Sequence, residues 1–242
     1  MWRRQQPDPD SRFLRLFAPR RGFCAFVALL LPLGAVSWHG SLSYAKAAPA
    51  EAALGRFSAG DLSGWEERSF AGQTRYRLEQ GGEGTALHAQ ALGSASILCR
   101  EVEIDLAALP VATWRWRLDR APIRDDERSR AGDDQGLRLS FLHRGGMLPG
   151  SVIAVQYVWS QTEALGAFWP NAFNPEAYQL AARSGPARPG DWAAEKRNLR
   201  ADFQRIFGRD IDRVDAVCVM TDGDQTGALV EGWYGDISMT RQ

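Results

Sequence analysis

The stretch that decides the fold is TWRWRL, Thr113 to Leu118. In an extended strand, successive side chains point to opposite faces. Its three large apolar residues, Trp114, Trp116 and Leu118, therefore share one face, and a threonine and two arginines share the other. This alternation predicts a strand with one face in a hydrophobic core and the other facing solvent or a ligand.

The same period of two recurs along most of the chain. GLRLSFL (136–142) alternates in the same way, and VIAVQYVW (152–159) is apolar on both faces, which is typical of a central strand. Shorter candidates bounded by Gly and Ser are RYRLEQ, TALHAQAL, SASILCREVEI, VDAVCVMT and WYGDISMT. Two long connections, 119–136 and 160–177, separate the strands, and loops of this length are usually functional or disordered.

One segment, NLRADFQRIFG (198–208), breaks the alternation because its apolar residues recur at helical spacing. Asn198 is a favourable N-cap, and Gly208 stands just past the expected end. We predict one short amphipathic helix near 198–207, over the edge of a sheet. Many short strands and a single helix predict an all-β fold, an antiparallel β-sandwich of jelly-roll type.

The first 47 residues have the layout of a cleaved secretory signal peptide. A basic segment ends at Arg20–Arg21, an apolar run follows from Gly22 to Val36, and AKA (45–47) is a cleavage site. Fifteen apolar residues are too few to span about 30 Å of hydrocarbon comfortably; an uncleaved anchor is the alternative. RRGF also fits twin-arginine export, so both export routes stay open.

We therefore predict a periplasmic or secreted bacterial protein in which residues 48–242 form one β-sandwich domain without a stable membrane span. Residues 1–47 hold seven of the 29 Lys and Arg residues and two of the 29 acidic ones, which leaves 22 basic and 27 acidic residues. Nucleic-acid binding needs a clustered positive surface, so nucleic acid is not expected as a partner.

Two cysteines, Cys99 and Cys218, remain after the signal peptide, each in a strand-like run. An exported location permits a disulfide between them, but two separately buried thiols fit the sequence equally well. Together with His88 and His143 they offer too few ligands, at no recognisable spacing, for a zinc site.

The segment MTDGDQTG, Met220 to Gly227, has three interpretations. Asp222 and Asp224 resemble the first half of a calcium loop, but an EF-hand would need Glu where Trp233 stands. A Ca²⁺ site assembled from separate loops, with Asp133 and Asp134 as further ligands, is the first interpretation. The second is a ligand-binding site, and the third is a hydrogen-bonded turn that ends the strand. No other cofactor is expected.

Charged and aromatic residues supply the candidate binding site. If the sandwich has a concave face, Arg115, Arg117 and Arg138 could line it beside the aspartate loops; loose ion pairs on a solvated face are the alternative. We expect Trp114, Trp116 and Trp159 in the core, and Trp169, Trp233 and Tyr234 exposed for stacking on a sugar. The predicted ligand-binding residues are Arg115, Arg138, Asp133, Asp134, Asp222, Asp224, Trp233 and Tyr234.

Several segments together resemble a known family of exported bacterial proteins, domain of unknown function 3047. They are, in order, TWRWRL, AGDDQGLRLSFL, YVWS, NLRADFQRIFG, MTDGDQTG and WYGDI. The resemblance covers roughly Phe57 to Met239 and implies no activity, because the family has none assigned. The family pattern usually has Asn where Gln225 stands and an aromatic where Gln135 stands, and either departure would weaken a ligand site.

The opening segment GRFSAGDLSGWEER is similar to the start of galactose-binding-type jelly rolls, which is an analogy of fold alone. No G-x-S-x-G nucleophile motif and no phosphate-binding glycine loop occur in the sequence, so we assign no catalytic residue. The preferred hypothesis is a binding module for a glycan or another cell-envelope ligand. The alternatives are a polysaccharide hydrolase or lyase, and a structural periplasmic protein without a small-molecule ligand.

Overall fold

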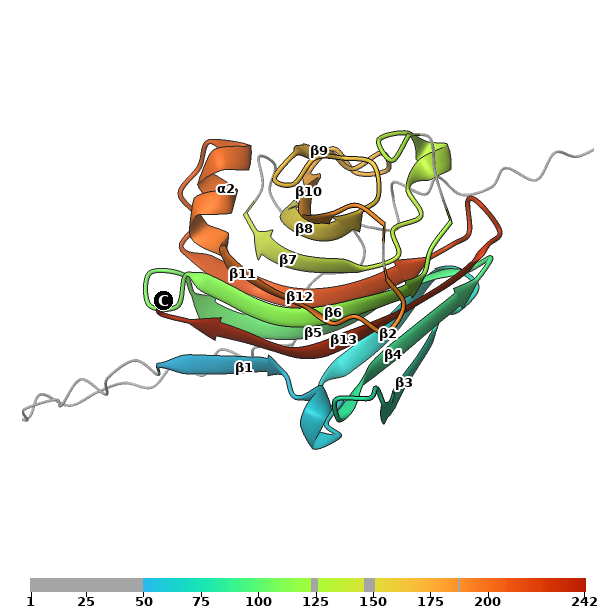
Figure 1. Cartoon of the computed structure of the whole chain (residues 1–242). Helices are drawn as coiled ribbons and strands as arrows, with labels where there is room; N and C mark the ends of the chain where they lie inside the picture. The colour runs from blue at the N-terminus through green and yellow to red at the C-terminus, as the bar shows by residue number, and fades with distance from the viewer. Residues whose placement is uncertain (1–49, 123–125, 146–150, 187) are drawn as a thin grey trace, which may run out of the picture.

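The computed structural model describes residues 50–122, 126–145, 151–186 and 188–242, which form two packed β-sheets (Figure 1). The predicted signal peptide, residues 1–47, lies outside the described residues. Within the described part of the chain, none of the helices has the length and apolar character needed to cross a lipid bilayer.

The first sheet has six strands in the order β11-β6-β13-β4-β3, and β1 pairs with β13. All of its pairs are antiparallel. The strands are β1 (Glu51–Gly55), β3 (Arg75–Gln80), β4 (Thr85–Leu92), β6 (Val111–Arg120), β11 (Ala193–Asn198) and β13 (Leu229–Thr240).

The second sheet has seven strands in the order β2-β5-β12-β7-β8-β10-β9. Its pairs are antiparallel except β8 with β10, which run parallel. The strands are β2 (Trp65–Ala71), β5 (Ala95–Asp105), β7 (Arg138–Arg144), β8 (Val152–Ser160), β9 (Phe168–Pro170), β10 (Ala177–Ser184) and β12 (Arg213–Asp222). Two 3-10 turns, Phe57–Ala59 and Arg130–Gly132, complete the connections together with the helix.

The core lies between the two sheets, and alternation explains which residues enter it. Trp114, Trp116 and Leu118 of β6 are buried there, as the alternation predicts. Trp116 packs against Trp159 of β8 with ring centroids 6.2 Å apart. Every residue of β8 is buried, because this strand lies between β7 and β10 and both of its faces are covered.

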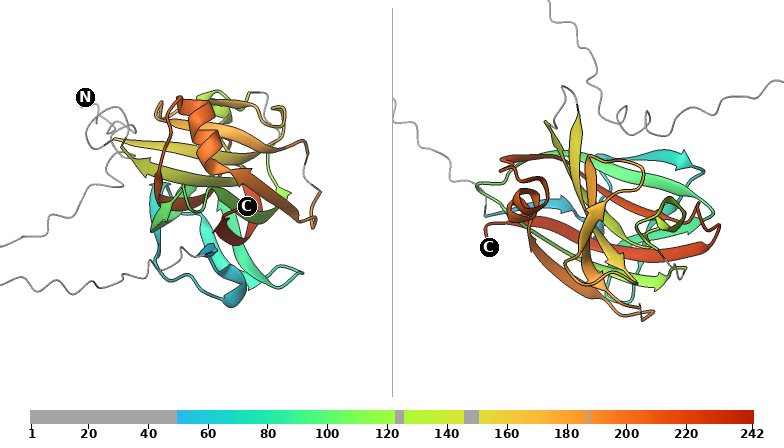
Figure 2. Two further views of the ribbon diagram at one scale, coloured as in Figure 1. Left: turned by 90° about the vertical axis from the view of Figure 1, so that its left-hand side faces the viewer. Right: turned by 90° about the horizontal axis from the view of Figure 1, so that it is seen from above.

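The predicted helix is confirmed as α2, Leu199–Phe207. The Asn198 side chain accepts a hydrogen bond from the Ala201 N–H at 3.0 Å, and Gly208 ends the helix in the left-handed conformation. Figure 2 shows α2 beside the strands at one end of the sandwich. The all-β sandwich of jelly-roll type is confirmed, with the parallel β8–β10 pair as its exception to antiparallel order.

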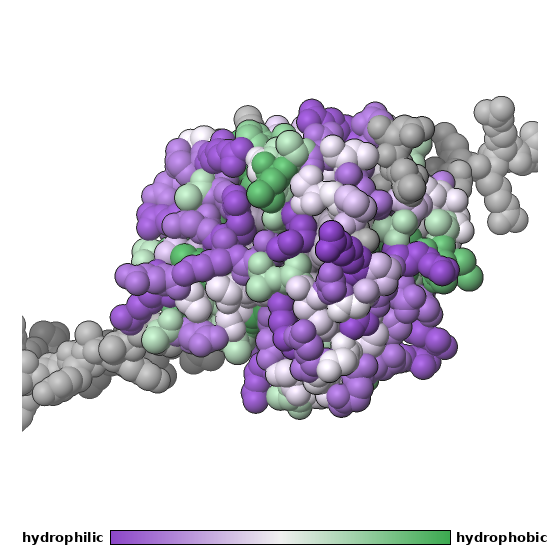
Figure 3. All heavy atoms as spheres, viewed as in Figure 1, coloured by the Kyte–Doolittle hydropathy of each residue, from purple (hydrophilic) through white to green (hydrophobic). Residues whose placement is uncertain are grey.

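The surface is mostly hydrophilic on the face shown in Figure 3. The large apolar side chains most exposed among the described residues are Leu92 and Leu165, which lie on different elements. On this face, a ligand would therefore meet polar side chains rather than a broad apolar patch.

Candidate functional site

The eight predicted site residues do not form one site. Arg115 and Trp233 lie on the outer face of the six-stranded sheet, where β6 pairs with β13. The other six meet where β12 ends beside the start of β7: Asp133, Asp134, Arg138, Asp222, Asp224 and Tyr234. The expectation of a single concave face shared by these arginines and aspartates is wrong, because Arg115 and Arg138 belong to different sheets.

The four aspartates, here called the aspartate cluster, meet through backbone pairing. The Asp222 N–H donates to the Gln135 carbonyl at 3.3 Å, which places the end of β12 against the segment before β7. Asp134 then accepts the N–H groups of Gln225 and Thr226 at 3.1 and 2.7 Å. These bonds hold the β12–β13 connection, which passes from one sheet to the other, in a closed turn.

Arg138 is the cation of the cluster and is only 4% exposed. Its Nη2 lies 3.3 Å from Asp222 Oδ2 and 3.4 Å from Asp133 Oδ1. Burial lowers the pKa of this guanidinium, but Asp222 and Asp133 outweigh burial and raise it. Arg138 therefore stays charged and binds the two carboxylates.

The negative charges of the buried aspartates are less well balanced by nearby cations and hydrogen-bond donors. Burial raises the pKa of Asp222 well above its usual range, against the opposing effect of Arg138, and neighbouring aspartates raise it further. Burial and the charge of Asp134 also raise the pKa of Asp224. A carboxylate whose pKa rises on burial lacks enough positive charge or donors nearby.

Three amide side chains that the sequence did not single out complete this network. Asn171 Nδ2 donates to Asp133 Oδ2 at 3.2 Å and lies 3.3 Å from Gln156 Oε1, and Gln179 Nε2 donates to Asp133 Oδ1. Gln156 interrupts the apolar run of β8 and Gln179 interrupts that of β10. The sequence signal for this network was a lone amide side chain within an apolar strand, because a buried amide needs a hydrogen-bond partner.

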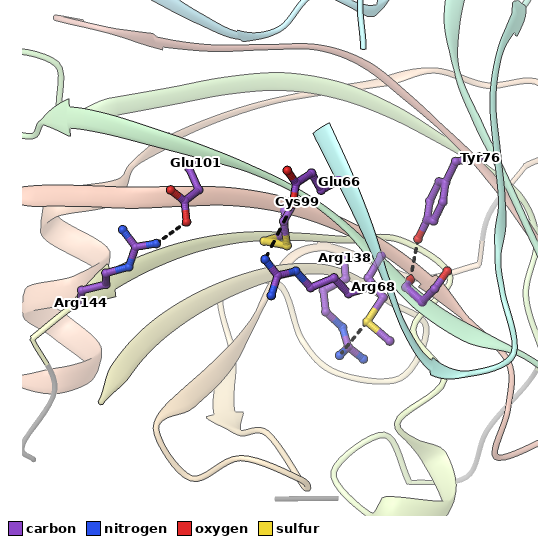
Figure 4. The surroundings of a disulfide bond; sticks show 10 residues. Glu66, Arg68, Tyr76, Cys99, Glu101, Arg138 and Arg144 are labelled. Carbon is purple, nitrogen blue, oxygen red and sulfur yellow. Dashed lines mark hydrogen bonds and ion pairs between the residues drawn. A yellow bond between two sulfur atoms is a disulfide. The ribbon is translucent and has the colours of Figure 1, made fainter. Parts of the chain in front are cut away.

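Several buried atoms here have no hydrogen-bond partner among the described residues. They are Asp222 Oδ1, both amide atoms of Gln135, Arg138 Nε, Ser140 Oγ and Gln179 Oε1. Arg138 Nη1 lies 3.9 Å from the sulfur of Met220. Figure 4 draws Arg138 among the surroundings of the Cys99 disulfide. Cys99 is joined to Cys218 by a disulfide between the paired strands β5 and β12.

The exposure expected for three aromatic residues is wrong. Trp169, Trp233 and Tyr234 are 2, 7 and 1% exposed. Tyr234 points into the sandwich, where its hydroxyl donates to the Met220 carbonyl at 2.6 Å. Trp233 lies on the outer face but is covered by His88, stacked at 4.1 Å, and by Arg117, whose Cζ is 4.5 Å from the ring.

A second indole, Trp192, extends this stack toward Arg115. The Arg115 Cζ lies 4.8 Å from the centre of the Trp192 ring, and Arg117 lies 5.5 Å from it. Arg115 also donates to Glu83 Oε2 at 2.6 Å. Its side chain runs across Gly235, where a Cβ would stand 2.4 Å from Arg115 Cγ. These contacts hold the guanidinium in one direction.

Beside Arg115 the outer face is hollowed into an open groove of about 450 Å³. Its lining is rich in hydroxyl and charged side chains: Ser58, Thr85, Thr113, Trp114, Arg115, Ala194, Glu195, Asp236 and Ser238. Asp236 accepts the Ser58 N–H at 2.8 Å and its hydroxyl at 2.5 Å. The groove therefore offers both donors and acceptors on a surface that solvent reaches.

Another groove, of about 510 Å³, lies near the start of α2. Its charged residues, Arg200 and Asp210, bind each other through two hydrogen bonds of 2.6 Å. None of its lining residues carries a hydroxyl, so it offers a ligand fewer donors and acceptors than the groove beside Arg115.

No curated protein sequence matches this chain. Among solved structures, a family 11 carbohydrate-binding module from Clostridium thermocellum, in complex with a mixed-linked tetrasaccharide, is similar at 9% identity and a TM-score of 0.46. The match covers 78% of this chain and 95% of that one.

Two further solved structures are similar to a comparable degree. TmCBM61, in complex with β-1,4-galactotriose, has 12% identity and a TM-score of 0.39, covering 77% of this chain and 94% of that one. The carbohydrate recognition domain of Emp47p has 12% identity and a TM-score of 0.42, covering 78 and 94%. Because all three TM-scores lie below 0.5, nothing about the ligand of this chain follows from them.

The family comparison covers most of the chain. The family described as "Protein of unknown function (DUF3047)" matches residues 63–238. This range includes both the aspartate cluster and most of the groove, and it agrees with the resemblance carried by the ordered segments from TWRWRL to WYGDI. The chain therefore belongs to the DUF3047 family.

Proposed function

We propose that the protein is a glycan-binding module whose site is the groove beside Arg115. The groove itself is the observation that carries this proposal. Its volume of about 450 Å³ falls within the range of small-ligand sites. The aspartate cluster is a poorer candidate for a glycan, because its side chains are buried apart from the half-buried Asp224.

The groove lining matches the chemistry of sugars. A sugar hydroxyl both donates and accepts hydrogen bonds, and the groove presents hydroxyls, a guanidinium and carboxylates within one hollow. Glu195 and Asp236 line the groove with Arg115, and Glu83 pairs with that arginine. Arg183 in turn pairs with Glu195 at 2.7 Å, so the acidic groups exceed the basic ones by Asp236 alone. This small negative excess favours a neutral glycan over an anionic one.

An exported location is part of this proposal. The disulfide between Cys99 and Cys218 supports it, because such bonds persist in oxidising compartments such as the periplasm. A cell-envelope or extracellular polysaccharide is the ligand that a binding module in that location would meet.

The test measures binding of the purified protein to a panel of soluble neutral oligosaccharides by calorimetry. Arg115→Ala removes a charge-assisted hydrogen bond worth about 1.5–3 kcal/mol, so affinity for the best ligand should fall roughly tenfold to a hundredfold. Arg75→Ala, an exposed arginine on β3 of the same sheet and outside the groove, is the matched control. Equal affinity of wild type and Arg115→Ala would refute the proposal.

Gly235→Ala tests the same site without touching a polar group. The new Cβ would collide with Arg115 Cγ and turn the guanidinium away from the groove. Affinity should fall as in Arg115→Ala, whereas Gly235→Ala combined with Arg115→Ala should bind no more weakly than Arg115→Ala alone. Additive losses in the double variant would show that Gly235 does not act through Arg115.

A further inference from the structure

Three carboxylates of the aspartate cluster lie close enough to share one ion. Asp134, Asp222 and Asp224 each offer an oxygen within 4.8 Å of the other two. Asp133 stands next to them, and Arg138 is the cation that pairs with Asp133 and Asp222. Four aspartates thus face one arginine. Like charges at this separation repel, and a bound cation among them would offset the repulsion.

The Asp222 carboxylate supplies a second, separate observation. This residue is 3% exposed, and its Oδ2 lies 3.3 Å from Arg138 Nη2, whereas its Oδ1 has no hydrogen-bond partner among the described residues. A buried carboxylate oxygen without a donor is unfavourable unless something positive binds it. The fully buried Gln135, whose carbonyl pairs with the Asp222 N–H, also has an amide oxygen without a partner.

Access to the cluster suits an ion rather than a larger ligand. Asp133, Asp134 and Asp222 are buried, whereas Asp224 is half-buried and the neighbouring Gln225 is exposed. An ion that sheds its hydration water can enter past Asp224. A sugar ring cannot reach the buried carboxylates unless the β12–β13 connection opens.

We propose that Asp134, Asp222 and Asp224 bind one calcium ion. The donors are all carboxylate oxygens, which are ligands of hard cations. Calcium accepts such ligands in a flexible geometry, whereas magnesium demands a near-ideal octahedron. The ion joins the segment before β7 to the β12–β13 connection and so holds the two sheets together at this end.

This inference goes beyond glycan binding, because the calcium site and the groove are far apart. Asp236 in the groove lies seven positions along β13 from Leu229, at the end of the connection. At about 3.4 Å a residue, these seven steps span roughly 24 Å. Calcium is therefore expected to stabilise the fold without contacting the glycan.

The experiment is thermal unfolding of the purified full chain after dialysis against EDTA, with and without 1 mM calcium, at about neutral pH. A Kd of about 10 μM predicts that calcium raises the Tm by roughly 5–10 °C. Equilibrium dialysis with radioactive calcium should show one tightly bound ion per chain. Unfolding curves that overlay in the two conditions would overturn the proposal.

Asp224→Asn is the test variant, because a half-buried, isosteric change leaves the fold intact while it removes a ligand charge. It should lose most of the calcium-dependent rise in Tm. Asp212→Asn, at an exposed aspartate outside the cluster, should keep the full rise. A full rise in Asp224→Asn would place the ion elsewhere and reject this site. Glycan affinity measured in EDTA separates this outcome from any failure of the groove proposal.

Discussion

At the scale of a single residue, Asp119 holds Arg117 and Trp233 in place on the outer face of the six-stranded sheet. Its carboxylate accepts Arg117 Nη2 at 2.8 Å, Trp233 Nε1 at 2.9 Å and the Gly190 N–H at 2.9 Å. Sequence reading placed Asp119 at the start of a long charged loop, but β6 continues to Arg120. The strand extends because β13 pairs with it there, which the local sequence does not show.

Because these donors stabilise the ionised Asp119 carboxylate, we expect the stability of the fold to depend on pH. Burial raises the pKa of Asp119, but the donors from Gly190, Arg117 and Trp233 outweigh burial and hold the pKa below its ordinary value of 3.8. A lowered pKa in the folded state means that the carboxylate stabilises the fold above pH 3.8, and that this contribution is lost as the pH falls through the folded pKa.

Asp119→Asn should therefore reduce the free energy of unfolding at pH 7, and the difference from wild type should shrink by pH 3. Urea unfolding of both proteins at the two pH values measures this. An equal difference at both pH values would contradict the role assigned to the charge of Asp119.

At the scale of elements, α2 is anchored by one buried carboxylate. Asp202 accepts the Tyr157 hydroxyl from β8 at 2.7 Å, and Arg197 of β11 donates to both of its oxygens, at 2.7 and 3.0 Å. Burial raises the pKa of Tyr157 well above its usual range, so its hydroxyl remains a donor. One helical residue thus joins strands from both sheets.

Asp202→Ala should lower the free energy of unfolding by about 3–5 kcal/mol, because it leaves a guanidinium and a buried hydroxyl without their acceptor. Tyr157→Phe removes only one hydrogen bond and should cost about 1 kcal/mol. Chemical denaturation of the two variants gives the comparison. Equal losses in both variants would mean that the ion pair with Arg197 contributes little.

Strand prediction succeeded where alternation was clear and failed where a strand is very short or lacks large apolar residues. β6, β7 and β8 follow from their side-chain patterns, and α2 follows from its spacing and caps. β9 has three residues inside the predicted 160–177 loop, and β11 (AAEKRN) lacks large apolar residues. Both exist because a partner strand supplies their hydrogen bonds, which no local pattern encodes.

At the scale of the whole molecule, the disulfide closes most of the domain. Cys99 and Cys218 are separated by 119 positions in sequence. In the chain-entropy model, cross-linking so long a loop removes about 5 kcal/mol of unfolded-state entropy. The bond joins β5 to β12 inside one sheet, and β13 follows β12 into the other.

The double variant Cys99→Ala, Cys218→Ala should therefore unfold at lower urea concentration and lose up to about 5 kcal/mol of stability. Alkylation of the wild-type protein in denaturant without reductant, followed by mass spectrometry, should leave both cysteines unmodified. Modification of either cysteine before reduction would show that the thiols are not joined.

The sequence by itself determined the all-β class, the core face of β6 and the single helix. These depend on period, caps and side-chain size, which act over a few neighbouring residues. Only the tertiary structure decided that Arg115 and Arg138 lie on different sheets, that Trp233 and Tyr234 are buried, and that four aspartates from two segments meet around Arg138. Those outcomes depend on strand order and register, and contacts between distant segments leave no trace in local alternation.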